Sequence, residues 1–436
     1  MTLVAHWRAR SRASEITARR AAYTEHEDGA ARDRWQLEAW NTEWRRILAE
    51  VPYYRALASR LSLPDRFESL AQFVALVPPL TRSTVQEEPQ SLTSSSRGPE
   101  FWRGTGGSTA QPVRLPAWRS EVQATRPDMW VGRGWYGITP ASRLFLIWGH
   151  SHRLRPGLRG WAAARKRELQ DRMLGYQRIS AYDLQPTAMR DAGAALLGSG
   201  SDYLVGYAVG LDRFAEANID QTEAFRALRL RAVIGTGEGF PDGAPDRLAQ
   251  LFGCPVAMEY GAVETGLLAH THPEGGFRAF WRSYLLDAER SPHGGHVLRV
   301  TSLFPRSMPL VRYEIGDEIV PLDPQADQVV GVAAFERVRG RLNDYVELSD
   351  GTRIHSTAFA YAVRTAPEIR SFQVVHGPAG LRIRFTADGP LPERSALDIV
   401  DRLRRLHPQL ATATFEPVDA LEQTVAGKTR MIVIEQ

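Results

Sequence analysis

The segment Ala257-Met-Glu-Tyr-Gly-Ala-Val-Glu-Thr-Gly266 runs from a short apolar stretch into a turn rich in glycine. This pattern predicts a β-strand that ends in a turn. In an open α/β sheet, ligands bind at the carboxyl ends of the strands. The ring of Tyr260 can stack on a purine there, and the carboxylate of Glu264 can hold a magnesium ion that bridges phosphates. The alternative is a surface turn with solvated carboxylates.

Short β-like runs alternate with helix-like segments around this turn. The β-like runs cover residues 144–148, 231–234, 255–258 and 297–300, and the helix-like segments cover residues 188–197 and 211–218. Upstream, tryptophans and aliphatic residues recur at helical spacing between residues 31 and 57, and Val51-Pro-Tyr-Tyr54 ends that helix. Strands that alternate with helices indicate an α/β fold.

The pattern changes after Arg339. Residues 340–436 contain strand-like runs at 371–375, 381–385 and 431–434 and a helix-like run at 392–406. We therefore predict two domains, residues 1–339 and residues 340–436.

Composition limits the class of protein. A chain of 436 residues exceeds the usual size of one domain, and the lone Cys254 allows no internal disulfide or cysteine-rich zinc site. No run of eighteen apolar residues and no secretory signal is present, so we expect a soluble, cytoplasmic protein that does not bind membranes. The net charge of +4 is small and does not indicate nucleic acid. The arginine-rich stretch 153–178 is best explained as a solvated helix face, and contact with a phosphate or with an acidic partner is the alternative.

A second candidate element is the loop Trp102-Arg-Gly-Thr-Gly-Gly-Ser-Thr-Ala-Gln-Pro112. Glycines such as Gly106 and Gly107 let backbone N–H groups approach a phosphate, and hydroxyls can add donors. The candidate hydroxyls belong to Thr105, Ser108 and Thr109. The loop lacks the Gly-Lys-Ser/Thr ending of a P-loop, and an ordinary flexible loop is the alternative.

Two further residues stand out. Asp317 ends the hydrophobic segment 308–317, and its carboxylate can accept both hydroxyls of a ribose. Lys166 and Lys428 are the only lysines, so 52 of the 54 basic residues are arginines. Lys428 therefore departs from the composition of the chain, and a compact ammonium suits a tight site of developing negative charge better than a guanidinium does. An incidental surface lysine is the alternative.

The order of these segments resembles the adenylate-forming superfamily of acyl- and aryl-CoA synthetases, peptide-synthetase adenylation domains and luciferases. The resemblance spans nearly the whole chain and is greatest to the phenylacetate-CoA ligase branch. It rests on Val51-Pro-Tyr-Tyr-Arg55, the loop 102–112, Gly237-Glu238, Glu259-Tyr-Gly261 with Glu264, Gly316-Asp317, Gly340-Arg-Leu-Asn-Asp344 and Gly427-Lys428.

The resemblance implies a large N-terminal domain of packed sheets and helices and a small, mobile α+β C-terminal domain. It implies an enzyme that uses ATP and Mg²⁺ to convert a carboxylic acid to acyl-AMP and then transfers the acyl group to coenzyme A. A homodimer is also expected from the resemblance alone. The implied ATP contacts are the loop residues Thr105 to Thr109, Gly237, Glu238, Glu259, Tyr260, Gly261, Asp317 and Arg341, with Glu264 as the metal ligand and Lys428 as the catalytic residue.

Three positions depart from the family pattern: Gln111 replaces the loop lysine, Val263 replaces a threonine, and Asn343 replaces the hinge aspartate. These changes leave two alternatives open. The acyl-AMP is transferred directly to an amine, or the chain is a noncatalytic homologue that binds nucleotide or acyl ligands.

Aromatic residues in the region expected to line the acyl pocket favour a flat aromatic acid. They are Trp130, Trp135, Tyr136, Phe145, Trp148, Tyr203 and Tyr207. His150 is a candidate to close the pocket or polarise the carboxylate, and a buried, satisfied histidine is the alternative. His270 and His272 have the spacing of a metal-binding pair but lack further ligands nearby.

Overall fold

The computed structural model describes most of the chain. The described residues are 3–25, 28–104, 114–148, 165, 169–181, 186–241, 243–291, 295–341, 345–350, 352–355, 359, 362–363, 366, 368–377, 380–387, 389–422 and 431–435. They form two compact units, and the division falls between Arg339 and Gly340. Over these ranges, no helix is long and apolar enough to cross a membrane.

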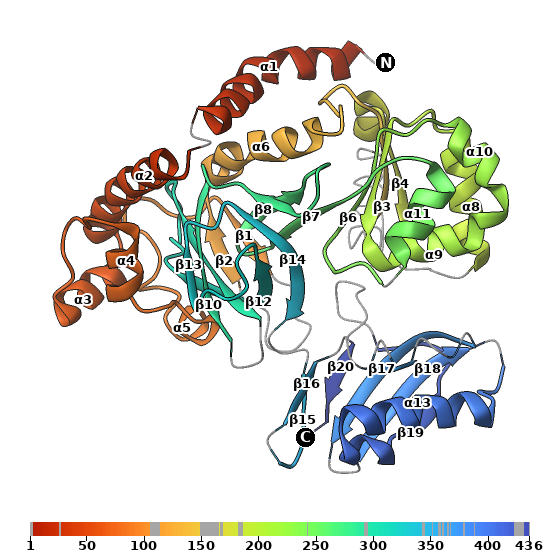
Figure 1. Ribbon diagram of the computed structural model, residues 1–436. Coiled ribbons are helices and arrows are strands. Elements are labelled where there is room, and N and C mark those ends of the chain that lie inside the picture. The colour runs from red at the N-terminus through yellow and green to blue at the C-terminus, as the bar shows by residue number, and fades with distance from the viewer. Residues whose placement is uncertain are drawn as a thin grey trace. The chain divides into compact units, whose positions relative to one another are not determined.

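A twelve-stranded sheet forms the centre of the first unit (Figure 1). Its order is β13-β10-β11-β12-β14-β9-β8-β7-β6-β5-β3-β4. The bounds are β3 (Leu144–Trp148), β4 (Tyr176–Ser180), β5 (Tyr203–Tyr207), β6 (Val233–Thr236), β7 (Val256–Ala262), β8 (Gly266–Thr271), β9 (Phe277–Ala279), β10 (Tyr284–Arg290), β11 (His296–Ser302), β12 (Tyr313–Pro321), β13 (Gln328–Val330) and β14 (Ala334–Arg341). The strands from β4 to β7 pair in parallel, and the direction reverses between β7 and β8.

Helices cover both faces of the parallel strands. Phe145 and Ile147 pack against one group of helices, whereas Leu144 and Leu146 belong to a cluster with Trp130 on the opposite face, because side chains alternate along a strand. The helices of this region are α6 (Arg119–Gly134), α8 (Pro186–Leu197), α9 (Ala208–Asn218), α10 (Thr222–Ala227) and α11 (Ala244–Phe252). Burial on both faces is typical of parallel sheets, and the predicted α/β architecture is confirmed.

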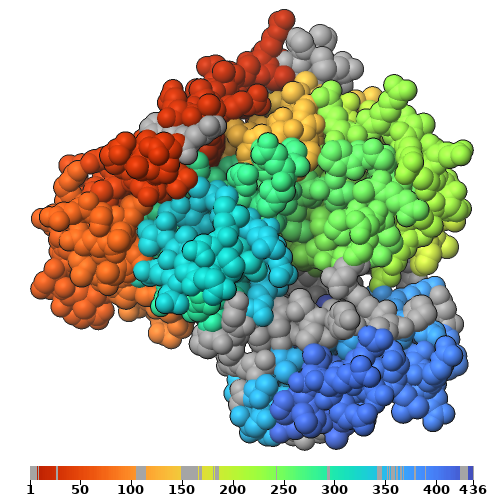
Figure 2. All heavy atoms as spheres, viewed as in Figure 1, coloured from red at the N-terminus to blue at the C-terminus, as the bar shows by residue number. Residues whose placement is uncertain are grey.

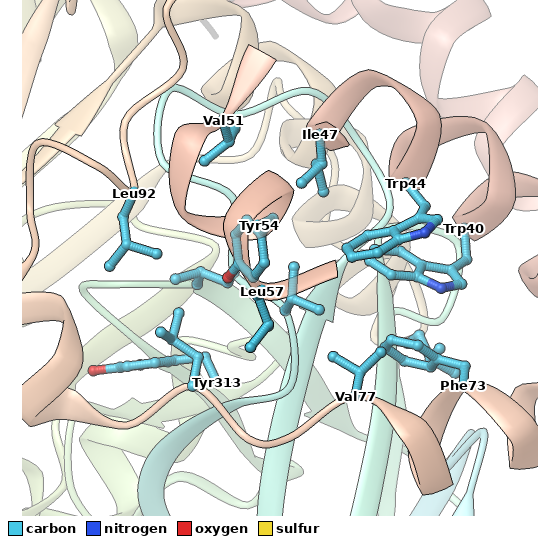
Figure 3. Close-up of a cluster of buried hydrophobic side chains, with 14 of the residues drawn as sticks. Trp40, Trp44, Ile47, Val51, Tyr54, Leu57, Phe73, Val77, Leu92 and Tyr313 are labelled. Atoms are coloured by element: carbon cyan, nitrogen blue, oxygen red, sulfur yellow. The ribbon is translucent and has the colours of Figure 1, made fainter. Parts of the chain in front are cut away.

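Four helices near the N-terminus pack against the antiparallel strands. They are α2 (Gly29–Glu50), α3 (Pro52–Leu61), α4 (Leu70–Leu76) and α5 (Arg82–Glu87). The predicted tryptophan helix is confirmed as α2: it ends before Pro52, and Trp40, Trp44 and Ile47 are fully buried (Figure 3). Removing one of these tryptophan rings would destabilise the unit by about 3–5 kcal/mol. Figure 2 shows this helical layer, in orange, directly against the cyan residues of the sheet.

Two smaller elements complete the first unit. The strands β1 (Phe101–Gly104) and β2 (Arg114–Ala117) pair antiparallel and form the stem of the loop 105–113. The helix α1 (Leu3–Thr24), which was not predicted, packs along α6.

The second unit contains a four-stranded sheet of order β19-β18-β17-β20 and a separate pair, β15 and β16. The bounds are β15 (Tyr345–Glu347), β16 (Arg353–His355), β17 (Ile369–Gly377), β18 (Gly380–Ala387), α13 (Glu393–Leu406), β19 (Thr414–Pro417) and β20 (Ile432–Ile434). Ile383 of β18 and Ile399 and Leu403 of α13 share its apolar core. The unit is α+β, as predicted.

Candidate active site

The carboxyl ends of four parallel strands lie side by side at one edge of the large sheet. Each end carries a residue that the sequence analysis selected: Trp148 ends β3, Tyr207 ends β5, Gly237 follows β6, and Glu259 lies on β7. The rings of Trp148 and Tyr207 are 4.4 Å apart between centroids. The fold therefore gathers candidate residues at the edge where α/β sheets bind ligands.

Glu259 is held in a buried ion pair. Its Oε1 and Oε2 accept hydrogen bonds of 2.6 and 3.1 Å from Nε and Nη2 of Arg133, and Nη1 of Arg133 donates to Tyr203 Oη at 3.2 Å. Burial raises the pKa of Glu259, but the charge and hydrogen bonds of Arg133 outweigh it, so the pKa is lowered. Glu259 stays ionised with its carboxylate bound to Arg133. Neither Arg133 nor this pairing was predicted, because 126 residues separate the partners.

Tyr260 and Asp317 are brought together by the fold. The Tyr260 hydroxyl donates to Asp317 Oδ2 at 2.9 Å, across 57 residues of sequence. The Tyr260 ring is held edge-on by Phe277 and Phe335. Two residues that were predicted to bind the nucleoside are therefore in direct contact, although Asp317 lies on β12 and Tyr260 on β7.

Glu264 lies in the turn between β7 and β8, and its side chain is mostly buried. Its Oε1 is 3.3 Å from Nη1 of Arg82, at the start of α5. Two donors hold the turn from below: Arg306 Nη2 donates to the Glu264 carbonyl at 2.6 Å, and the Tyr284 hydroxyl donates to the Thr265 carbonyl at 2.5 Å. The turn is therefore fixed through its backbone. The carboxylate of Glu264 takes no part in these two bonds and instead faces Arg82.

The turn is also tight. A Cβ added to Gly261 would lie 2.2 Å from the Gly266 carbonyl oxygen, and Gly266 has a φ of +85°. Both positions therefore require glycine. Only residues 263–265 separate β7 from β8.

A single carboxylate fits a magnesium ion that takes its other ligands from phosphates and water. The carboxylate of Glu264 has the hard oxygen atoms that such an ion prefers, and its partner in the structure is the guanidinium of Arg82. Within the described ranges, no three histidine, cysteine, aspartate or glutamate side chains form a metal cluster. His270 is buried against Trp135 and Tyr136, and His272 lies near Glu274.

The carboxylate of Glu238 lies at the N-terminal end of α9. Its Oε1 accepts from the Val209 backbone N–H at 3.3 Å, where the positive end of the helix dipole favours a carboxylate. It follows Gly237 in the segment after β6.

Several predicted site residues lie outside the described ranges. They are Thr105, Gly106, Gly107, Ser108, Thr109, His150 and Lys428. Arg341 ends β14, but its side chain is not described. Of the residues proposed for the acyl pocket, Trp130, Phe145 and Tyr203 belong to packed cores.

Comparison with known proteins assigns the fold. No family model matches the chain. A 2-hydroxyisobutyryl-CoA ligase in complex with 2-HIB-AMP shares 15% identity at a TM-score of 0.68, over 94% of this chain and 91% of that one. The chain therefore has the fold of this CoA ligase, and the fold that the resemblance implied is confirmed.

Further relatives share the fold or part of the sequence. The amide bond synthetase McbA from Marinactinospora thermotolerans is 17% identical at a TM-score of 0.50, over 76% of this chain and 67% of that one. O-succinylbenzoate coenzyme A synthetase from Bacillus subtilis, in complex with ATP and magnesium, is 15% identical at a TM-score of 0.50, over 76% and 68%. Protein CapK of Staphylococcus aureus is 22% identical over 166 residues, which span 37% of this chain and 36% of CapK.

Proposed function

We propose that this protein activates a carboxylic acid with ATP and then transfers the acyl group to coenzyme A. The substrate carboxylate attacks the α-phosphorus of ATP, pyrophosphate leaves, and acyl-AMP forms. The thiol of coenzyme A then attacks the acyl carbon, and AMP leaves. The observation that carries this proposal is the hydrogen bond between Tyr260 and Asp317, at the carboxyl edge of a sheet with the adenylate-forming fold.

Different residues of the site contact the adenine and the ribose of the nucleotide. Asp317 accepts the ribose hydroxyls, and its bond to Tyr260 sets the position of the ring that stacks on adenine. Glu259, tied to Arg133, holds the strand end beneath them. Gly237, Glu238, Gly261 and Arg341 complete this part of the site.

The loop residues 105–109 and the turn of Glu264 are the proposed contacts of the phosphates. Glu264 would hold Mg²⁺, which neutralises phosphate charge when bound. Lys428 supplies a positive charge to the carboxylate and α-phosphate as they react. Residues 340–436 act as the mobile unit that carries Lys428. Catalysis then depends on positioning and charge neutralisation, and no protein nucleophile is needed.

An aromatic acid is the proposed substrate. The rings of Trp148 and Tyr207, tilted by 32° to each other, supply aromatic contacts at the ends of β3 and β5, next to the nucleotide residues. His150 lies two residues after Trp148 in sequence and is the candidate to orient the acid's carboxylate.

An amine is the second candidate acceptor. The likeness to an amide bond synthetase favours it, because the same acyl-AMP can be captured by an amine without coenzyme A. Gln111 and Asn343, which depart from the family pattern in the loop and the hinge, also motivate this candidate.

The test is pyrophosphate release with ATP, Mg²⁺ and a panel of aromatic and aliphatic acids. We expect acid-dependent release that falls roughly 10²–10³-fold in Lys428→Ala. Lys166→Ala removes the only other lysine and is the matched control, which should retain the wild-type rate. Repeating the assay with coenzyme A, with amines and with hydroxylamine identifies the acceptor. Binding of ATP without turnover on any acid would favour a noncatalytic protein.

A further inference from the structure

A fully buried carboxylate joins two parts of the proposed phosphate site. Glu121 lies in the first turn of α6, and its Oε2 is 3.1 Å from Nη2 of Arg103 and 3.6 Å from Nε of Arg306. These three residues, which we call the 103–121–306 bridge, come from separate segments of the first unit. Arg306 is among the largest side chains that are fully buried.

One end of the bridge holds the stem of the loop 105–113. Arg103 lies on β1, opposite Leu115 of β2. Oε1 of Glu121 also accepts from the backbone N–H of Trp118, the residue directly after β2, at 2.9 Å. Glu121 therefore contacts both strands of the stem, one through a guanidinium and the other through the chain that follows it.

The other end of the bridge holds the turn of Glu264. Arg306 Nη2 donates to the Glu264 carbonyl, and Glu121 Oε1 accepts from the backbone N–H of Ser307 at 3.0 Å. The segment that carries Arg306 is thus tied at its backbone and through its side chain. The path from the loop stem to the predicted metal ligand runs through Glu121 and Arg306.

Stability alone is a weak reason for such an arrangement. Buried charges lose several kcal/mol of hydration each, and well-packed apolar residues often replace a buried ion triad without loss. Two guanidiniums share one carboxylate, and Nε of Arg306 has no hydrogen-bond partner in the structure. What the bridge provides in return is a fixed distance between two backbone segments.

We propose that the 103–121–306 bridge is a positioning device that sets the distance between the β1–β2 stem and the turn of Glu264, on which binding of Mg-ATP depends. This inference rests on the proposed function. Each of the three side chains acts through the segment that it holds.

Binding of Mg-ATP, measured by calorimetry, tests the proposal without requiring turnover. Arg103→Met and Arg306→Met each leave Glu121 with one guanidinium, so the buried carboxylate keeps a cationic partner while one end of the bridge is lost. We expect each to weaken Mg-ATP binding about tenfold. The triple variant Arg103→Met, Glu121→Gln, Arg306→Met should weaken it no more than the larger single effect, because both ends belong to one device.

Arg299→Met is the control for loss of a mostly buried arginine. Arg299 pairs with Glu289 and Glu314 on the sheet, so its removal should lower the unfolding midpoint but leave Mg-ATP binding unchanged. Bridge variants with a lowered midpoint and wild-type binding would show a merely structural role and overturn the proposal. Effects that multiply in the triple variant would also overturn it, since the two ends would then act independently. Wild-type binding without acid-dependent turnover would reject the proposed function alone, whereas absence of binding would reject both.

Discussion

The two units of the molecule bury different kinds of side chain. The first unit buries charged side chains where segments distant in sequence meet; examples are Glu121, Asp128, Arg133, Glu259, Asp287, Arg306, Arg312 and Glu318. The described part of the second unit buries an apolar core and, among polar side chains, Gln373. The difference indicates that the first unit uses ion pairs to fix many segments around a site, whereas a small sheet with one covering helix is specified by its apolar pattern.

The largest effect on stability is expected at the Arg133–Glu259 pair. Arg133→Met leaves the Glu259 carboxylate buried without its partner, which should lower the free energy of unfolding of the first unit by about 3–5 kcal/mol. Urea denaturation measures it. The double variant with Glu259→Gln removes both charges and should recover much of the loss. If the double variant is no more stable than the single one, the charge is not the cause.

The next effect depends on pH. Burial raises the pKa of Asp128 from 3.8 to about 6, although Arg19, Ser283 and Tyr23 lower it in part. The native state then holds a proton that the unfolded state has lost, so the free energy of unfolding should fall as pH rises from about 4 to about 6. The rise in pKa corresponds to about 3 kcal/mol.

Asp128→Asn isolates the contribution of Asp128 to the pH dependence of stability, because an amide cannot ionise. Denaturation at several pH values should show the stability of the wild type falling relative to the variant by up to about 3 kcal/mol across that window. The Asp128 carboxylate accepts hydrogen bonds from Tyr23 of α1 and from Ser283. The ionisation of Asp128 should therefore also change the stability of the contact between α1 and the rest of the first unit. Parallel pH profiles of the two proteins would contradict the prediction.

A smaller effect is expected at the buried polar residue of the second unit. The Gln373 amide donates to the Glu422 carbonyl at 2.8 Å and accepts from its N–H at 3.0 Å. Gln373→Met leaves both backbone groups unpaired and should lower the stability of this unit by about 1–3 kcal/mol. Hydrogen exchange at the Glu422 amide measures the local opening; Val375→Ala, on the same strand, is the control that removes apolar contacts without touching Glu422.

The smallest effect is expected on the surface of the second unit. Arg404 and Asp401 of α13 form an exposed ion pair of 2.6 Å. Arg404→Ala should change the free energy of unfolding by about 0.5 kcal/mol or less, since solvent and salt screen such pairs. A loss of several kcal/mol here would show that charge matters equally in the two units.

Local patterns predicted much of the fold. The run 144–148 is β3, the helix-like run 392–406 is α13 apart from its first residue, and the tryptophan helix ends where Pro52 forbids its continuation. Each of these depends on periodicity or a breaker within a few residues. The helix α1 was missed because its apolar spacing is weak and its packing depends on bonds from Tyr23 to Asp128 and from Arg19 to Ser283, more than a hundred residues away.

The candidate site was predictable where residue type alone narrows the chemistry. Tyr260, Glu264 and Asp317 were selected for groups that suit a nucleotide or metal, and the fold brings Tyr260 and Asp317 within hydrogen-bonding distance. Arg82 beside Glu264 and Arg133 beside Glu259 were missed. In a chain with 52 arginines, no single arginine carries a local signal, and only tertiary structure reveals its partner.

The turn between β7 and β8 has a consequence for how such a protein changes over generations. Because the sheet reverses direction there over three residues, with Gly261 and Gly266 in close contact, an insertion would separate Glu264 from Tyr260 and open the sheet at its centre. By contrast, the segment between β6 and α11 joins a strand to a helix and can change length without breaking strand pairing. Changes in substrate would therefore arise in that connection, while this hairpin keeps a fixed length.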